Sequence, residues 1–135
     1  MATPAYSRPA YSSLDSAAVI ALVVRKSAQI RSERWPFVKD ISRLLFDLRE
    51  RGFRFRNLGL RRIPGGYYSE DVETFVGQLL SMGYATQRSP IRLEEKGEKL
   101  CEEIIAAEGE VKREELTKLE TALAELLPSR SPVIS

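Results

Sequence analysis

With 135 residues, the chain is long enough to form one domain whose hydrophobic core needs no disulfide or metal. Histidine is absent and cysteine occurs once, which removes the usual general base, the commonest transition-metal ligand and any intrachain disulfide. No apolar run approaches the roughly 18 residues of a membrane span. We therefore expect a cytoplasmic protein that is not an enzyme, has no metal or cofactor and does not cross a membrane.

The net charge of +2 conceals a strong asymmetry along the chain. Residues 1–66 contain 13 Lys/Arg and 5 Asp/Glu, whereas residues 67–135 contain 8 and 14, so the two parts carry +8 and −6. Such a distribution indicates a basic surface that meets a polyanion. The alternative is that the two parts face and neutralise each other, within a monomer or across a dimer.

The first third of the chain predicts a tail followed by two helices. Residues 1–13 are polar and contain proline, so we expect them to be disordered. A helix capped by Ser13 or Asp15 should reach about Ala28, and it is apolar on nearly every side, which places it in the core or in a dimer interface. Pro36 is well placed to begin a second helix, which Gly52 ends.

Residues 52–68 form an unusually basic connection that we interpret as two short extended runs with turns. Arginines alternate with Phe53 and Phe55, and Tyr67 and Tyr68 add aromatic surface beside them. Arginines next to aromatic residues suit phosphate contact and base stacking. The alternative is an edge hairpin whose charges keep it soluble and unpaired. Together with Arg51, which directly precedes this connection, its arginines form a basic cluster: Arg51, Arg54, Arg56, Arg61 and Arg62.

Residues 69–107 have the order of a winged helix: helix, small hairpin, helix. Ser69 is a suitable N-cap, apolar residues recur at helical spacing after it, and Gly83 suits the position just after the helix. Residues 84–88 and 91–93 are strand-like runs joined at Ser89-Pro90. A further helix opens near Glu95, and it should bury Cys101 as an inert thiol.

The C-terminal part predicts a separate helix over residues 111–127, after a break at 108–110. Its leucines recur at the spacing of a coiled-coil seam, and they have no obvious destination within the chain. We therefore predict a homodimer held by this seam, although short seams also pack on their own domain. The seam consists of Leu116, Leu119, Leu123 and Leu126. The predicted organisation is a tail at 1–13, a winged-helix domain at 14–107, a C-terminal helix at 108–127 and a tail at 128–135.

Two segments resemble known families. The run Gly83-Tyr84 … Ile91-Arg92-Leu93-Glu94-Glu95-Lys96-Gly97-Glu98-Lys99-Leu100 resembles the end of winged-helix regulators of the MarR and PadR type, with Glu94 where a capping threonine is usual. A closer likeness is to the YwgA-like proteins, and it covers about residues 14–107. It is carried by Trp35-Pro36-Phe37-Val38-Lys39 … Leu44-Leu45-Phe46, Gly52-Phe53-Arg54-Phe55 and Gly66-Tyr67-Tyr68-Ser69. The resemblance implies a mainly α winged helix with a small β-hairpin wing, flanked by N- and C-terminal helices, and a regulatory role through nucleic-acid binding.

We therefore expect a dimeric transcription regulator that binds duplex DNA. The helix over 70–82 has no Lys or Arg, and its outward carboxylates would face phosphates, so Gln78 is its main candidate for base contact. The other contacts would come from Arg88 and Arg92 of the wing, together with Tyr67, Tyr68 and the arginine cluster. The alternative is a winged helix that binds a protein partner through the acidic 70–82 helix or the leucine seam, without binding DNA.

Overall fold

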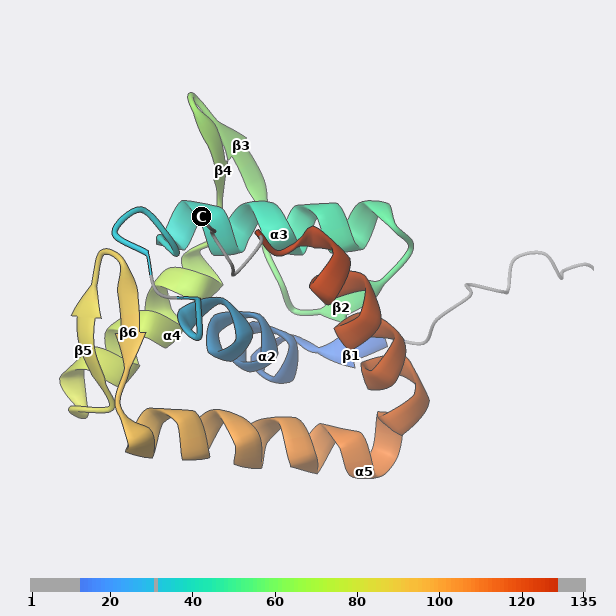
Figure 1. Ribbon diagram of the computed structural model, residues 1–135. Coiled ribbons are helices and arrows are strands. Elements are labelled where there is room, and N and C mark those ends of the chain that lie inside the picture. The colour runs from blue at the N-terminus through green and yellow to red at the C-terminus, as the bar shows by residue number, and fades with distance from the viewer. Residues whose placement is uncertain (1–12, 31, 129–135) are drawn as a thin grey trace, which may run out of the picture.

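The chain is wrapped around one buried helix, α2, as the computed structural model of residues 13–30 and 32–128 shows (Figure 1). Four helices and three two-stranded pairings account for the regular structure of these residues, which is mainly helical. In chain order the elements are β1 (Ser13–Asp15), α2 (Ser16–Ala28), α3 (Val38–Glu50), β2 (Arg54–Arg56), β3 (Arg61–Ile63), β4 (Gly66–Tyr68), α4 (Glu70–Ser81), β5 (Ala85–Arg88), β6 (Ile91–Leu93) and α5 (Glu95–Leu126). The predicted tails at 1–13 and 128–135 lie outside the described residues, apart from Ser13 and Pro128. No helix in the described part of the chain is both long and apolar enough to span a bilayer.

Helix α2 forms the centre of the core because it is apolar on every side. Asp15 caps it by accepting a hydrogen bond from the Ala17 N–H at 3.1 Å. Every residue from Ala18 to Val24 is at most 2% exposed. The predicted helix and its burial are confirmed, and its destination is the core of the chain itself.

Helix α3 starts at Val38, two residues later than the proline pattern predicts. Pro36 is not helical, and its carbonyl accepts the Ile91 N–H at 2.7 Å. Asp40 then caps the helix by accepting the Phe37 N–H at 2.8 Å. The tertiary hydrogen bond to β6 therefore holds the residues before α3 in an extended conformation.

The basic connection after α3 contains three strands instead of two extended runs. β2 pairs in parallel with β1, in the register Leu14 to Phe55. β3 and β4 form an antiparallel hairpin of their own. Four arginines of the predicted cluster are therefore divided between two separate β structures, and the fifth, Arg51, caps the end of α3.

Helix α4 and the hairpin β5–β6 match the predicted second half of the domain. Ser69 accepts the Val72 N–H at 3.4 Å, and the helix is followed by Gly83, whose φ of 76° is in the left-handed region. The N–H groups of Gly83 and Tyr84 bond the carbonyls of Leu80 and Leu79, as in a Schellman motif. The strand–turn–strand prediction over 84–93 is confirmed.

Helix α5 bends sharply at Lys112, whose φ of −127° and ψ of 46° are not helical. The break predicted at 108–110 therefore falls slightly later, and it separates a first arm (95–111) from a second arm (113–126). Figure 1 shows the first arm running along one side of α2 and the second arm turning back towards α3. Both arms thus cover the same core.

The leucine seam faces the core of its own chain, which corrects its predicted role. Leu116, Leu119 and Leu123 are 6%, 0% and 1% exposed, and Leu126 is half-buried against the same cluster that contains α2 and α3. The premise that these leucines lack a destination within the chain is therefore wrong. Homodimerisation stays a prediction, but it would require another surface.

Candidate nucleic-acid interface

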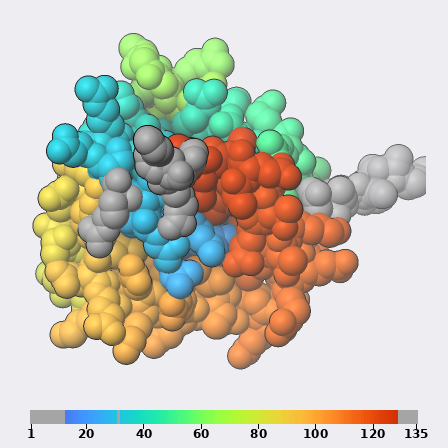
Figure 2. All heavy atoms as spheres, viewed as in Figure 1, coloured from blue at the N-terminus to red at the C-terminus, as the bar shows by residue number. Residues whose placement is uncertain are grey.

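The hairpin β3–β4 is the most prominent projection of the described structure. Its outer end projects past α3 (Figure 1 and Figure 2). Its two strands pair Arg61 with Tyr68 and Arg62 with Tyr67. Pro64-Gly65 makes the turn, and the φ of 88° at Gly65 is readily adopted only by glycine. The result is a narrow ribbon with arginines on one strand and tyrosines on the other.

One face of the ribbon is fixed on α3 by an aromatic stack. The rings of Tyr67 and Phe46 lie 4.3 Å apart with an angle of 18° between their planes. The guanidinium groups of Arg43 and Arg62 lie 5.6 and 5.5 Å from the centre of the Tyr67 ring. Arg62 also donates a hydrogen bond to the Tyr67 hydroxyl at 3.1 Å, and this bond raises the pKa of the guanidinium above its ordinary value. The ribbon therefore has a fixed orientation and a permanently charged side chain on this face.

The opposite face of the ribbon carries Arg61. Its guanidinium lies 5.2 Å from the centre of the Tyr68 ring and 3.7 Å from a carboxylate oxygen of Glu70 in α4. The side chains of Arg61 and Glu70 are 63% and 78% exposed, so water screens this pair strongly. A phosphate can compete with Glu70 for Arg61 at little cost.

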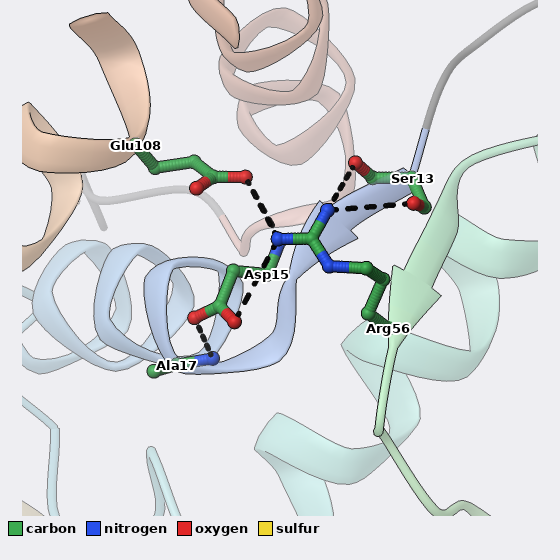
Figure 3. Close-up of polar contacts among 5 residues, drawn as sticks. All are labelled: Ser13, Asp15, Ala17, Arg56 and Glu108. Carbon is green, nitrogen blue, oxygen red and sulfur yellow. Dashed lines mark hydrogen bonds and ion pairs between the residues drawn. The ribbon is translucent and has the colours of Figure 1, made fainter. Parts of the chain in front are cut away.

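Two of the other predicted arginines are held by contacts within the chain. Arg51 pairs with Glu125 of α5 at 2.6 Å. Arg56 joins three elements, as Figure 3 shows. It donates to the Ser13 carbonyl at 2.9 Å and lies 3.8 and 3.9 Å from carboxylate oxygens of Asp15 and Glu108. These contacts tie β1 to β2 and α5, so they favour a structural role for Arg56.

The remaining arginine of β2, Arg54, is exposed and forms no salt bridge within residues 13–30 and 32–128. It lies beside a surface hollow that is also lined by Arg49, Gly52, Phe53 and Phe55. Arg54 is therefore available to an external anion, but it does not belong to the projecting ribbon.

The arginines of the predicted wing contact the protein itself. Arg88 of β5 forms a salt bridge with Glu73 of α4. Arg92 of β6 is half-buried and donates to the carbonyls of Trp35 at 3.2 Å and of Ser32. Gln78 is exposed on α4. Arg88 thus neutralises one carboxylate of α4, and Arg92 anchors the segment before α3. Of these three predicted contacts, Gln78 is the one whose side chain is exposed on a helix surface.

Acidic residues of α4 and α5 contact groups in the basic first part of the chain. Asp71 accepts the Gly59 N–H at 2.8 Å and so fixes the loop that leads to the ribbon. Glu102 pairs with Arg25 at 2.7 Å, in the same way that Glu125 and Glu108 hold arginines of the first half. Three of these ion pairs therefore join the basic first part of the chain to the acidic second part in the body of the molecule. On the ribbon, Arg62 forms no salt bridge within the described residues.

Arg43 of α3 also contributes to this surface, although the sequence did not indicate it as a contact. On its own face of α3, Arg43 pairs with Asp47 at 3.2 Å. Only the stacking of Tyr67 on α3 brings Arg43 to the ribbon, and no local sequence signal predicts that contact. We call the set Arg43, Arg61 and Arg62, with the two tyrosines of β4, the ribbon surface.

Cys101 lies away from this surface, in the core. It is 0% exposed, and burial raises the pKa of its thiol from 9.0 to about 11. A thiol that stays protonated is a poor nucleophile. Its predicted burial is confirmed. In the described ranges no three His, Cys, Asp or Glu side chains are placed to hold a metal ion.

Comparison with protein-family models, curated proteins and solved structures finds no match for this chain. Its function must therefore be inferred from its own geometry.

Proposed function

We propose that this protein binds nucleic acid and that it contacts the phosphate backbone through the ribbon surface. The observation that carries the proposal is a projecting hairpin, stacked on α3 through Tyr67, with an exposed arginine on each of its two faces. Phosphate contacts supply most of the affinity of such proteins and position them on the duplex. A role in transcription regulation, in the cytoplasm, would follow from binding of this kind.

The order of the elements supports this proposal, because it is compatible with a winged helix. Helices α2, α3 and α4 are followed by the hairpin β5–β6, which is the order of that fold. The segment between α2 and α3 bonds to β6 through the Ile91 N–H and the Pro36 carbonyl at 2.7 Å, as a third strand beside the wing would. Such a scaffold often holds a helix and a hairpin against DNA.

The distribution of charge favours the ribbon over α4 and the wing as the main contact. The first turn of α4 contains Glu70, Asp71 and Glu73, which repel phosphates. Arg88 already neutralises Glu73 and so adds little net positive charge. Of the residues predicted to bind nucleic acid, we therefore assign the leading role to Arg61 and Arg62, with Arg43 added.

The test is a salt titration of binding to a random-sequence DNA duplex. If about four phosphates are neutralised, log K should fall with log salt with a slope of about −3.6. The double variant Arg61→Ala/Arg62→Ala should weaken binding to all sequences alike and flatten the slope by about 1.8. Lys96→Ala/Lys99→Ala is the matched control, since it removes the same charge from exposed positions on the first arm of α5, far from the ribbon (Figure 1).

Equal losses in the two variants would show that net charge alone drives binding and would contradict the proposed site. Absence of binding at about 50 mM salt would reject nucleic-acid binding altogether. In that case the exposed face of α4, with Glu70, Thr74, Gln78 and Ser81, favours the second candidate, a module that binds a protein partner.

A further inference from the structure

The two arginines of β3 point to opposite sides of the ribbon. Successive side chains of a strand alternate between faces, so neighbours cannot share one. The contacts agree with this rule: Arg62 lies with Tyr67 on the face that packs on α3, whereas Arg61 lies with Tyr68 on the face that reaches Glu70 of α4. The ribbon therefore carries positive charge on both sides at once.

Charge on both faces fits a groove better than a flat surface. If the ribbon lay flat on a duplex, only one of its faces would meet the phosphates. The arginine on the other face would then make no phosphate contact. A ribbon that enters a groove tip first has a phosphate backbone on each side. Arg61 and Arg62 would then each meet one wall.

The tip of the ribbon is free of charge. β3 and β4 are joined through Ile63, Pro64, Gly65 and Gly66, and Pro64 and Gly65 are exposed. These residues would be the first to reach the groove floor, where they offer apolar contact and no salt bridge. In DNA the apolar group on the floor of the major groove is the C5 methyl of thymine.

The dimensions select the major groove of B-form DNA. Two paired strands are about 4.8 Å apart, and the side chains on each face add to the thickness of the ribbon. The major groove is about 12 Å wide and accepts a two-stranded ribbon, whereas the minor groove is about 6 Å wide. The major groove of A-form RNA is too narrow for side chains to read.

We propose that the hairpin β3–β4 enters the major groove of B-form DNA tip first, with Arg61 and Arg62 on the phosphates of opposite walls and Ile63 and Pro64 on the floor. This inference rests on the proposed nucleic-acid binding and specifies its target and its mode. The stack of Tyr67 on Phe46 holds the ribbon in place before binding, which lowers the entropy lost on association.

The experiment measures fluorescence anisotropy of the full chain with three duplexes of equal length and related sequence. They are an A·T-rich DNA, the same DNA with every thymine replaced by uracil, and an RNA duplex. The RNA should bind at least about tenfold more weakly. Loss of the thymine methyl groups should weaken binding by about two- to fourfold. Because these changes are made in the nucleic acid, they cannot unfold the protein.

A protein variant connects the methyl effect to the tip. Ile63→Ser should bind the thymine and uracil duplexes equally, while thermal unfolding checks that it remains folded. Pro64→Ser serves the same purpose at a fully exposed position.

The outcomes separate this inference from the function on which it rests. If Arg61→Ala/Arg62→Ala loses binding but the RNA and both DNA duplexes bind wild type alike, insertion into the major groove is overturned and phosphate binding stands. Tighter binding of the RNA duplex would likewise overturn it. Absence of binding to all three duplexes would reject both proposals.

Discussion

Replacing Gly97 with alanine should destabilise the fold, although alanine is the better helix former. Gly97 lies in the first turn of α5, where an added Cβ would be 2.2 Å from the carbonyl oxygen of Tyr84. That oxygen belongs to the backbone just before β5, and it already accepts the Glu94 N–H at 2.9 Å. Neither a rotamer change nor a small local movement can therefore relieve the clash.

The magnitude follows from the distance that has to be recovered. An ordinary contact of about 3.4 Å would require the start of α5 to move away from Tyr84 by about 1 Å, which would disturb the packing of Cys101 and its neighbours in the core. Overpacking of this kind costs about 1–3 kcal/mol. The gain in helix propensity on replacing glycine is at most about 1 kcal/mol. The free energy of unfolding should thus fall by about 1–2 kcal/mol.

Gly77→Ala is the matched control, since it makes the same chemical change in a helix with open space around it. A Cβ at Gly77 would meet nothing within 4 Å, so only the propensity gain remains. This variant should be more stable than wild type by about 0.5–1 kcal/mol. Both variants can be measured by urea unfolding with the fluorescence of Trp35, the only tryptophan of the chain. Gly97→Ala as stable as wild type would refute the close approach of α5 to Tyr84.

Three further predictions test the interface, the core and the thiol. Glu70→Gln should strengthen duplex binding by about 1.5- to 5-fold, because it frees Arg61 from an exposed ion pair. Glu103→Gln makes the same charge change at an exposed position of the first arm of α5 and should strengthen binding much less. Leu119→Ala should lower the free energy of unfolding by about 2–5 kcal/mol without changing the molar mass in light scattering, whereas dissociation of an oligomer would restore the seam as an interface. Cys101 keeps its proton in the folded state up to about pH 11 but loses it near pH 9.0 when unfolded, so stability falls as the pH rises between these values. Relative to Cys101→Ala, wild type should lose up to about 2.7 kcal/mol of stability over this window in urea unfolding, and parallel pH profiles would contradict the burial of the thiol.

The sequence by itself determined the elements whose signals are local. The cap at Ser69, the helix after it and the turn at Gly83 are specified by groups within a few residues of one another, and all were found as predicted. The hairpin over 84–93 and the burial of α2 follow equally from strand-like runs and from an apolar surface on every side. Periodicity and capping act over one or two turns of chain, so one sequence suffices to read them.

Only the tertiary structure decided which arginines remain available to a partner and whether the leucine seam does. Arg56 meets Glu108 and Arg51 meets Glu125 across more than fifty residues of chain, and no spacing rule links those positions. The leucine seam had the same pattern whether it faced a second copy or its own core, and the bend at Lys112 directed it inward. The stack of Tyr67 on Phe46 likewise placed Arg43 beside Arg62. A side chain's type and period say that it will be buried or paired, but its partner depends on where the chain folds back, and that depends on the packing of all the helices together.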